Sequence, residues 1–570
     1  MLNRYTITAL VLSICLFNAI AKAQAVSGTA SATDRSTPSA LAPGASPLGS
    51  YGGSNFDNIN LFNGNLNLTF PLASLGGRAG LGVSVVLSYN SKIWRVEQQT
   101  NEITGAKLFV PVYDQWDASS PQIAPGWVIN AGRLVGRQVG WLDKFCPGDS
   151  NLRWEYTLTR LTFIAPDGTE YELRDKLNDG RPLETISNPP FGGCTGASRG
   201  TEFVTADGSA ATFYSNSTIT DYAGLADQQN VFGDAHQLIF PSGKLLLRDG
   251  TRFKIVNGLV LEQQDRNGNI VRFKYTEDSS RLIEVTDTLD RKIEIEYDVA
   301  PTTLVRVKVN GINGEQRTIL VERAPLDDVR RSGQPLLAEN QLFPIPKYNA
   351  STTIFNPVVV SSIVLPSGHR WNFEYNSYGE IVCLKTPSNG VIEYDAEEGE
   401  GPYPPGADTD RQIFRRVKER RTYADGSSLE GRVTYSDPSL KTAGVPNPVM
   451  ERFFNGSGTL LSEVRHKFNG SPLDNYGKSY GVSFNTPRGL IFTDYKPWKE
   501  GREVETVQID NNNDKRKVNS TFEQRALVSW SANDINDANQ PENDTRLTRT
   551  KTTLLDTSQV SEVEYQYDLY

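Results

Sequence analysis

Short stretches in which apolar and polar residues alternate make up much of the chain. In the segment 291–297, Ile293, Ile295 and Tyr297 fall on one face of an extended chain, and the charged residues between them fall on the other. This period of two is typical of a strand with one buried face. Asn-Gly pairs at 257 and 267 separate such stretches and tolerate the positive φ of tight turns. The pattern predicts consecutive antiparallel β-hairpins.

The same pattern of strands and turns recurs on both sides of this segment. Further strands are predicted at 66–70, 83–89, 303–309, 315–322, 358–365, 370–375, 416–423 and 431–435. No stretch predicts an amphipathic helix longer than about three turns, and the best short candidate is 222–234. Because a unit of this size cannot bury its own apolar face, neighbouring units must stack. The predicted fold class is all-β, an array of antiparallel hairpins forming a wide curved sheet.

Particular residues recur within these hairpins. The first copy contains Asp265, Gly268, Asn269, Tyr275, Asp287, Arg291, Tyr297 and Asp298. Later copies contain Tyr375, Gly379, Tyr394 and Asp395, and then Tyr567 and Asp568. This pattern resembles the Rhs/YD-repeat family, in which D-x-x-G-N and D-x-x-G-R turns precede strands that end in Tyr. The chain departs from the family pattern at Asp290, where glycine is usual. The segment 60–91 also looks like the region that precedes YD repeats in large bacterial members.

The resemblance implies both a fold and a role. Complete relatives coil such strips into a hollow β shell, which encloses a toxic C-terminal domain in toxin complexes and serves adhesion in teneurins. It therefore implies an exported, non-catalytic scaffold, part of a shell for toxin encapsulation or surface display. Because the chain stops in the middle of a repeat, a downstream or separate chain is expected to complete the shell. The alternative is a secreted or surface adhesin that binds glycans through its N-terminal β domain, around 51–249.

Four segments are predicted along the chain. Residues 1–23 form a signal peptide, because Arg4 precedes the apolar run 5–20 and Ala21-Lys22-Ala23 has the small-x-small form of a cleavage site. Residues 24–50 form a flexible linker rich in Ala, Ser, Gly and Pro. An N-terminal β domain at 51–250 and a repeat array at 251–570 follow. The protein is expected to be secreted or displayed at the cell surface, with the periplasm as an alternative and no membrane span after cleavage.

Cysteine usage fits an exported protein. Cys146 and Cys194 lie in glycine-containing loops, and in an oxidising compartment the two are candidates for a disulfide. Cys383 lies between apolar residues of a predicted strand and is expected to be a buried free thiol.

Charge and residue type point away from several functions. The 570-residue chain has a net charge of −9, which argues against a nucleic-acid partner. Its three histidines are His236, His369 and His466, and none has zinc-ligand spacing. No nucleophile elbow or phosphate loop is present. We therefore expect no enzyme activity and assign no catalytic, cofactor or metal residue; a secreted hydrolase is the third and weakest interpretation.

The Asp- and Asn-rich segments and the repeat tyrosines resemble parts of ligand-binding sites, but both have simpler structural interpretations. Segments 265–269 and 510–514 carry oxygen side chains at alternate positions, as a calcium loop does, but neither has the closing glutamate. Asp and Asn also favour turns by bonding to the nearby backbone, and we expect that role here. The repeat tyrosines are expected to stack on one another and hold the array together, rather than to bind sugars.

Overall fold

The computed structural model describes residues 46–54, 56–100, 107–113, 122–145, 152–181, 183, 186–187, 194–225, 235–277, 280–299, 304–311, 313–344, 350–399, 411–437, 441–442, 445–446, 448–469, 483–486, 489–492, 497–528 and 540–567. The expected signal peptide at 1–23, residues 24–45 of the expected linker, Cys146 and Asp568 lie outside these ranges.

The described chain is almost entirely β-structure, which confirms the all-β prediction. Every pairing between its named strands is antiparallel. The helical elements of the described residues are single turns: η2 Arg78–Gly80, η3 Leu326–Val329, α2 Glu339–Leu342 and η4 Arg411–Phe414. None of the described helices has the length and hydropathy needed to cross a bilayer. Strands predicted at 370–375, 416–423 and 431–435 are observed with the same bounds.

The helix predicted at 222–234 is wrong where the structure describes it. Strand β16 (Tyr222–Leu225) pairs with β10 (Leu152–Ile164), and the Tyr222 and Tyr156 rings stack at 5.1 Å between centroids. Packing across the strands therefore decides the conformation of this segment over its weak helical pattern.

Six strands form an inner sheet in the order β1-β2-β3-β4-β8-β7. Their bounds are β1 Tyr51–Gly53, β2 Asp57–Asn60, β3 Leu66–Leu75, β4 Val83–Asn90, β7 Gln122–Ala124 and β8 Trp127–Ile129. Most of β4 is buried on both faces, which fits its nearly continuous apolar sequence. A hairpin of β5 (Trp94–Thr100) and β6 (Lys107–Tyr113) follows β4.

A second sheet begins with β9 (Arg133–Phe145) and closes into a barrel. Strands β10, β11, β14, β15, β18, β19 and β20 pair in turn, and β17 and β20 both pair with β9. The remaining bounds are β11 Glu170–Asp175, β14 Ser198–Thr205, β15 Thr212–Thr220, β17 Ala235–Ile239, β18 Gly243–Leu246, β19 Arg252–Val256 and β20 Leu259–Gln264. The predicted domain boundary at residue 250 falls between β18 and β19, which pair with each other.

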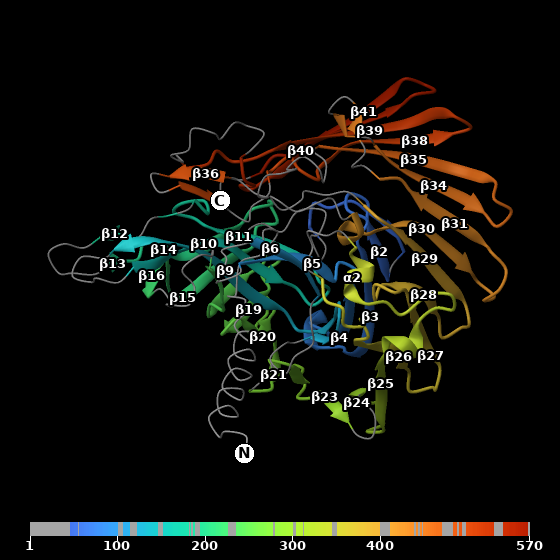
Figure 1. Ribbon diagram of the computed structural model, residues 1–570, viewed down its shortest axis with the longest axis horizontal. Coiled ribbons are helices and arrows are strands. Elements are labelled where there is room, and N and C mark those ends of the chain that lie inside the picture. Colours follow the sequence, from blue (N-terminus) through green and yellow to red (C-terminus); the bar gives the residue numbers. More distant parts are fainter. Residues whose placement is uncertain are drawn as a thin grey trace, which may run out of the picture.

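From β20 the sheet continues as a long meander in which successive strands pair (Figure 1). Its bounds are β21 Ile270–Tyr275, β22 Leu282–Thr286, β23 Lys292–Val299, β24 Leu304–Asn310, β25 Gln316–Pro325, β26 Val358–Val364, β27 Arg370–Tyr375, β28 Ile381–Lys385, β29 Val391–Glu397, β30 Arg416–Tyr423, β31 Gly431–Tyr435, β34 Val449–Asn455, β35 Leu460–Phe468, β38 Glu503–Asp510, β39 Asn513–Glu523, β40 Arg546–Leu554 and β41 Gln559–Glu564. Three small hairpins branch from the chain: β12 Ile186–Ser187 with β13 Cys194–Thr195, β32 Lys441–Thr442 with β33 Val445–Pro446, and β36 Ser483–Thr486 with β37 Gly489–Phe492.

The meander curves around the inner sheet, so that the blue strands of Figure 1 lie between the green barrel and the yellow and orange strands. Alternate residues of each meander strand face inward, as Ile293 and Ile295 of β23 do. Aromatic side chains fill the space between the layers. The ring centroid of Trp127 lies 5.0 Å from that of Phe373, and Phe70 lies 5.5 Å from the same ring. Burial of these large rings holds the inner sheet against the concave face of the meander.

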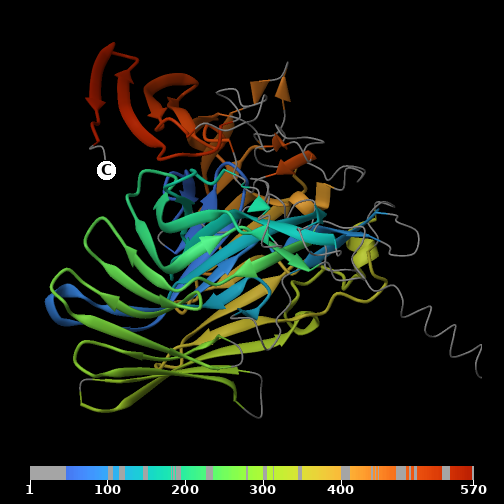
Figure 2. The ribbon, with the colours of Figure 1, turned by 90° about the vertical axis from the view of Figure 1, so that its left-hand side faces the viewer.

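A late part of the meander returns to the barrel. The Arg174 guanidinium donates to the Glu542 carbonyl at 2.6 Å, and the amide of Thr545 donates to the Ala206 carbonyl at 2.9 Å. Arg525 pairs with Asp179 at 2.8 Å between Nη2 and Oδ1. These contacts join chain segments more than 300 residues apart. The outermost strands, β38–β41, then stand away from the body of the molecule (Figure 2).

Candidate functional site: the seam between inner sheet and meander

The repeat motif residues first act in hairpin turns. Asp265 Oδ1 accepts hydrogen bonds from the amides of Asn267 and Asn269 at 2.8 and 2.9 Å, and its Oδ2 accepts from Asn269 Nδ2 at 2.8 Å. These bonds, led by that of the Asn269 side chain, lower the pKa of Asp265. Gly268 has the positive φ of 85° that the turn requires. The Asp265 carboxylate therefore closes a turn.

The same device recurs at three other turns. Asp287 accepts from the amides two and four residues ahead, as do the side chains of Asn376 and Asn455. Asp290 adopts a φ of 60° where the family pattern has glycine, so an L-residue occupies the left-handed position there. Sequence reasoning missed Asn455, although its N-x-x-G spacing is the signal that identifies it. In 510–514, Asn511 and Asn512 form the two-residue turn between β38 and β39, both with positive φ.

The repeat tyrosines bond to the backbone of the preceding strand. The hydroxyls of Tyr275, Tyr297 and Tyr375 each donate to a carbonyl 15 residues earlier, at 2.9, 2.9 and 2.6 Å. The expectation that these rings stack on one another is wrong, since no ring pair in the described part of the chain joins two of them. The physical reason is the register of the strands. The hydrogen-bonded ladder between β20 and β21 ends at the pair of Glu262 and Arg272, and the Tyr275 hydroxyl bonds to the backbone of β20 beyond that end. Tyr567 makes an equivalent bond to Leu547 at 2.7 Å.

Two of the repeat tyrosines also reach the inner sheet. The Tyr375 hydroxyl accepts from Trp127 Nε1 at 3.1 Å, and the Tyr394 hydroxyl donates to Asp57 Oδ2 at 2.6 Å. Arg420 Nε lies 2.6 Å from the same carboxylate oxygen, and no part of Asp57 is exposed to solvent. Burial, reinforced by the Asp57 charge, raises the pKa of Tyr394 well above its ordinary value. We call this set of five residues, Asp57, Trp127, Tyr375, Tyr394 and Arg420, the seam.

Backbone contacts continue the seam on both sides. The amide of Ile381 donates to the Tyr89 hydroxyl at 3.2 Å, and Trp94 Nε1 donates to the Tyr378 carbonyl at 2.9 Å. The loop between β2 and β3 approaches β30 so closely that a Cβ on Gly64 would lie 2.3 Å from the Arg416 Cβ. The inner sheet is thus joined to the meander by hydrogen bonds as well as by its aromatic core.

Removing the Tyr375 hydroxyl tests the seam directly. We expect Tyr375→Phe to lower the free energy of unfolding by about 2–3 kcal/mol, because the buried Trp127 N–H and Val360 carbonyl both lose their partner. Tyr297 is less buried than Tyr375, so Tyr297→Phe removes only one part-buried bond and should cost about 1 kcal/mol. The exposed Tyr565 provides a control, and Tyr565→Phe should change nothing measurable. Urea unfolding followed by tryptophan fluorescence gives all three values; equal costs for the two repeat tyrosines would contradict the seam.

The repeat aspartates Asp298 and Asp395 form ion pairs with arginines of neighbouring strands and loops. Asp298 pairs with Arg281 at 3.3 Å and with Arg323, whose guanidinium also donates to the Ile123 carbonyl of the inner sheet at 2.9 Å. Asp395 accepts a two-pronged bond from Arg421 at 2.6 and 2.8 Å. The first aspartate therefore helps to fasten the inner sheet, and the second joins β29 to β30.

A buried histidine fastens the start of β1 to the late strands. His466 Nδ1 lies 2.6 Å from Glu503 Oε1, and its Nε2 lies 3.5 Å from Glu451 Oε2. Ser50 donates to the other oxygen of Glu503. Burial acts to lower the pKa of His466, but the bonds to the two glutamates outweigh it and raise the pKa to about 9. His466 is therefore a cation at neutral pH that holds two carboxylates.

This histidine predicts a pH dependence of stability. Because the pKa in the folded state lies above the unfolded value of 6.5, the contribution is fully present below pH 6.5 and is lost as the pH rises through about 9. We expect a loss on the order of 3 kcal/mol across that window. His466→Gln should flatten the profile, whereas His369→Gln, at an exposed site, should leave it unchanged. Urea unfolding from pH 6 to 10 measures this, and a flat profile for the unsubstituted chain would contradict it.

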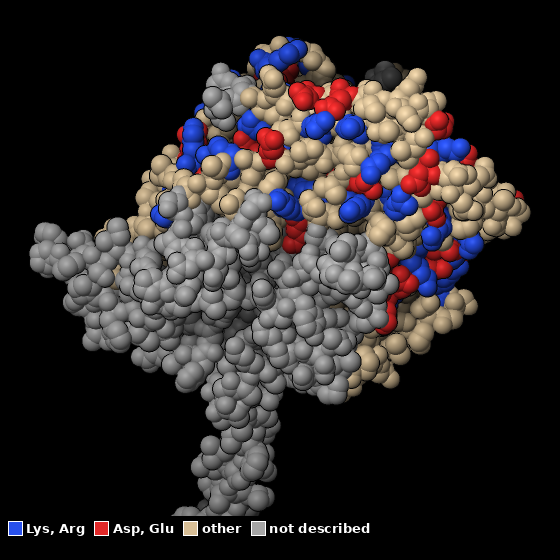
Figure 3. All heavy atoms as spheres, turned by 90° about the horizontal axis from the view of Figure 1, so that it is seen from above, with Lys and Arg blue, Asp and Glu red and all other residues tan. Residues whose placement is uncertain are grey.

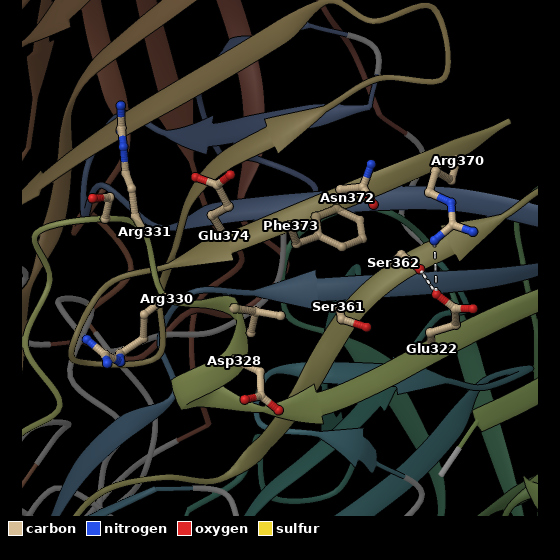
Figure 4. Close-up of a pocket in the computed structure, with 12 residues that line it drawn as sticks. Glu322, Asp328, Arg330, Arg331, Ser361, Ser362, Arg370, Asn372, Phe373 and Glu374 are labelled. Carbon is tan, nitrogen blue, oxygen red and sulfur yellow. Dashed lines mark hydrogen bonds and ion pairs between the residues drawn. The ribbon is translucent and has the colours of Figure 1, made fainter. Parts of the chain in front are cut away.

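A polar cleft of about 500 Å³ lies beside η3, over β25–β27 (Figure 4). Several of its charged groups are paired: Glu322 Oε2 accepts from Ser362 at 2.5 Å and lies 3.3 Å from Arg370 Nη1. Glu374 pairs with Lys385 at 2.9 Å. Ser361 and Asn372 add uncharged donors and acceptors to the lining. This arrangement suits an uncharged polar ligand.

The described cysteines differ in state. Cys194 is disulfide-bonded, and its partner lies outside the described residues, so its pairing with Cys146 stays a prediction. Cys383 is a free thiol, as expected, and burial raises its pKa to about 11. Within the described ranges, no group of three or more potential ligands is placed to hold a metal ion. Figure 3 shows positive and negative side chains interspersed over the described part of one face.

No family model matches the chain, and no curated protein matches its sequence. Among solved structures, the chain is similar to a porin-like protein from Bacteroides uniformis, with a TM-score of 0.17 and 9% identity over 51% of this chain and 96% of that chain. It is also similar to TcdB2-TccC3, with a TM-score of 0.18 and 9% identity over 88% of this chain and 28% of that chain. For the Tc holotoxin pore of Photorhabdus luminescens, the TM-score is 0.18 at 9% identity, over 85% and 27% of the two chains. The chain spans little more than a quarter of these toxin chains, and TM-scores this low do not establish a common fold.

Proposed function

We propose that this protein is a non-catalytic structural scaffold whose meander holds the inner sheet on its concave face. The seam is the observation that supports this proposal most directly. Its polar groups bond to one another across the two layers: Asp57 with Tyr394 and Arg420, and Trp127 with Tyr375. Side chains used in this way hold two sheets together and are not available to bind or activate a substrate.

Hydrogen exchange in increasing denaturant tests the scaffold role. If the meander holds the inner sheet, the amides of β3–β4 and of β27–β30 should exchange through one common unfolding event with the same free energy. Independent exchange of the inner sheet at a much lower free energy would contradict the proposal. In parallel, the purified chain should turn over no member of polysaccharide and peptide libraries; turnover abolished by one carboxylate substitution would identify a hydrolase.

The resemblance of the repeat residues extends this proposal to a larger assembly. It implies that the meander is part of an Rhs/YD-type β shell for toxin encapsulation or surface display, completed by a downstream segment or a separate chain. We also propose that the protein is exported with cleavage after Ala23. Intact mass of the native product, detected with an antibody against 51–250, tests both points. Retention of residues 1–23 would contradict export, and a species much heavier than 63.0 kDa would support the larger shell.

A second candidate function is carbohydrate binding by a secreted or surface adhesin. The cleft beside η3 favours it, because Ser361 and Asn372 supply uncharged polar groups beside the ion-paired Glu322 and Glu374. This cleft lies in the repeat array rather than in the segment 51–249, where the sequence places the ligand site. A glycan array probed with the whole chain tests it. Binding that Asn372→Ala abolishes would support the adhesin, and silence across the array would contradict it.

A further inference from the structure

The outermost strand of the meander has an open edge. Strand β41 pairs along one side with β40, and no other described strand pairs with it. All six of its residues are exposed, including the apolar side chains of Val560 and Val563. Figure 2 shows the red strands at the outer limit of the molecule. An open edge of this kind presents a row of backbone donors and acceptors to another strand.

At several places in this sheet, acidic and basic side chains of neighbouring strands form ion pairs, although Glu284 faces Glu294 and Arg421 faces Arg432. Lys254 and Glu262 face each other across β19 and β20, with Nζ and Oε1 3.4 Å apart. Comparable pairs join other neighbours: Lys292 with Glu284, Lys385 with Glu374, Lys517 with Glu505 and Arg549 with Glu562. Opposite charges on facing strands stabilise a sheet and like charges destabilise it, so this matching favours one register and one partner.

Strand β41 carries two acidic side chains on one face, and one of them, Glu562, pairs with Arg549 of β40. Glu562 and Glu564 are two residues apart and share a face, where Lys551 and Arg549 of β40 lie opposite them. Val563 and Ser561 lie on the other face. A strand added to the open edge would meet the same two glutamates. Two copies of β41 paired edge to edge would instead bring two acidic strands together, which their like charges oppose.

We propose that the open edge of β41 binds a strand of another polypeptide that carries Lys or Arg at two positions two residues apart, with Thr or Val between them. Strand β40 already has this pattern in Arg549-Thr550-Lys551-Thr552. The added strand would place its basic residues opposite Glu562 and Glu564. Its small β-branched residues would cover the exposed Val563. The inference rests on the scaffold role, since it names the kind of strand that extends the scaffold.

A peptide with the β40 sequence RLTRTKTTL tests the proposal on the whole chain. The control peptide has glutamate at both basic positions of the R-T-K segment. We expect fluorescence anisotropy to show binding of the basic peptide that weakens with salt, and a control affinity lower by roughly tenfold. Hydrogen exchange should show protection of the amides of 559–564 by the basic peptide. With both carboxylates neutralised, the double variant Glu562→Gln, Glu564→Gln should lose this preference for the basic peptide.

Several distinct results would contradict the proposal. Failure of both peptides to bind, equal affinity for the two, or protection away from β41 would overturn the proposal. Dimerisation of the unsubstituted chain that the double variant abolishes would also overturn it, because a second copy would then occupy the edge. Circular dichroism of the double variant checks its fold, which should persist because β41 is exposed on both faces. None of these results affects the hydrogen-exchange test, in which β3–β4 and β27–β30 should unfold in one common event. Failure of this inference can therefore be distinguished from failure of the scaffold role.

Discussion

Replacing Asp57 with alanine is expected to lower the free energy of unfolding by about 3–5 kcal/mol, because it leaves a largely buried cation without its partner. Asp57 is completely buried and accepts bonds from Arg420 and Tyr394 at 2.6 Å each. Without the carboxylate, the Arg420 guanidinium and the Tyr394 hydroxyl both lose this acceptor. The two layers should then separate more easily, so the exchange of β3–β4 should become faster than that of β27–β30.

A carboxylate in an exposed pair is the matched control for this substitution. Asp514 lies 2.8 Å from Arg465, and its side chain is 41% exposed. Solvent screens such a pair, so Asp514→Ala should cost less than about 1 kcal/mol. Urea unfolding of both variants at neutral pH makes the comparison. A cost for Asp57→Ala no larger than that of the control would show that the seam does not hold the layers together.

Replacing Arg199 with methionine should be at least as damaging, with an expected cost of about 3–5 kcal/mol. Arg199 is fully buried between Asp175 and Asp221, whose side chains are 1% and 0% exposed. It donates to Asp221 at 2.6 and 3.1 Å and to Asp175 at 3.2 Å. Methionine fills similar space but leaves two buried carboxylates without a cation.

Neutralising the two carboxylates shows whether the loss of stability in Arg199→Met comes from the unpaired charges or from the changed shape of the side chain. In the triple variant Arg199→Met, Asp175→Asn, Asp221→Asn, no uncompensated charge remains, and stability should recover by at least half of the loss. Lys176→Met is the control, because Lys176 forms an exposed pair with Glu202 and should cost less than about 1 kcal/mol. If the single variant does not accumulate in folded form, recovery of folded protein in the triple variant still measures the effect. A triple variant less stable than the single would contradict the electrostatic explanation.

Local patterns were read correctly where the interaction itself is local. The turns at Asp265 and Asp287 bond within four residues, so their residue types and spacing are sufficient to predict them. The strands of the repeat array follow from alternation for the same reason. At 222–225, the described part of the helix expected at 222–234, the structure has a strand because Tyr222 packs on Tyr156, a partner that no local pattern contains.

The residues that matter most for the candidate site were not predictable in this way. Asp57 meets Tyr394 across 337 residues of sequence and Arg420 across 363. Tyr375 and Tyr394 were identified from their spacing, but their contact with the inner sheet was not. Arg199 of β14 lies 22 residues from Asp221, which directly follows the neighbouring strand β15, and only the register of the two strands brings them together.

The sequence by itself therefore determined the all-β class, most strand positions in the repeat array, and the turn motif, because these depend on contacts between residues close in the chain. The tertiary structure alone decided that the first strands form an inner sheet, that the barrel at β9–β20 continues into the meander, and which side chains make the seam. It also decided that the repeat tyrosines bond to backbone rather than stack. The reason is that these features depend on strand register and on pairings across hundreds of residues. The local alternation of apolar and polar residues contains no information about either.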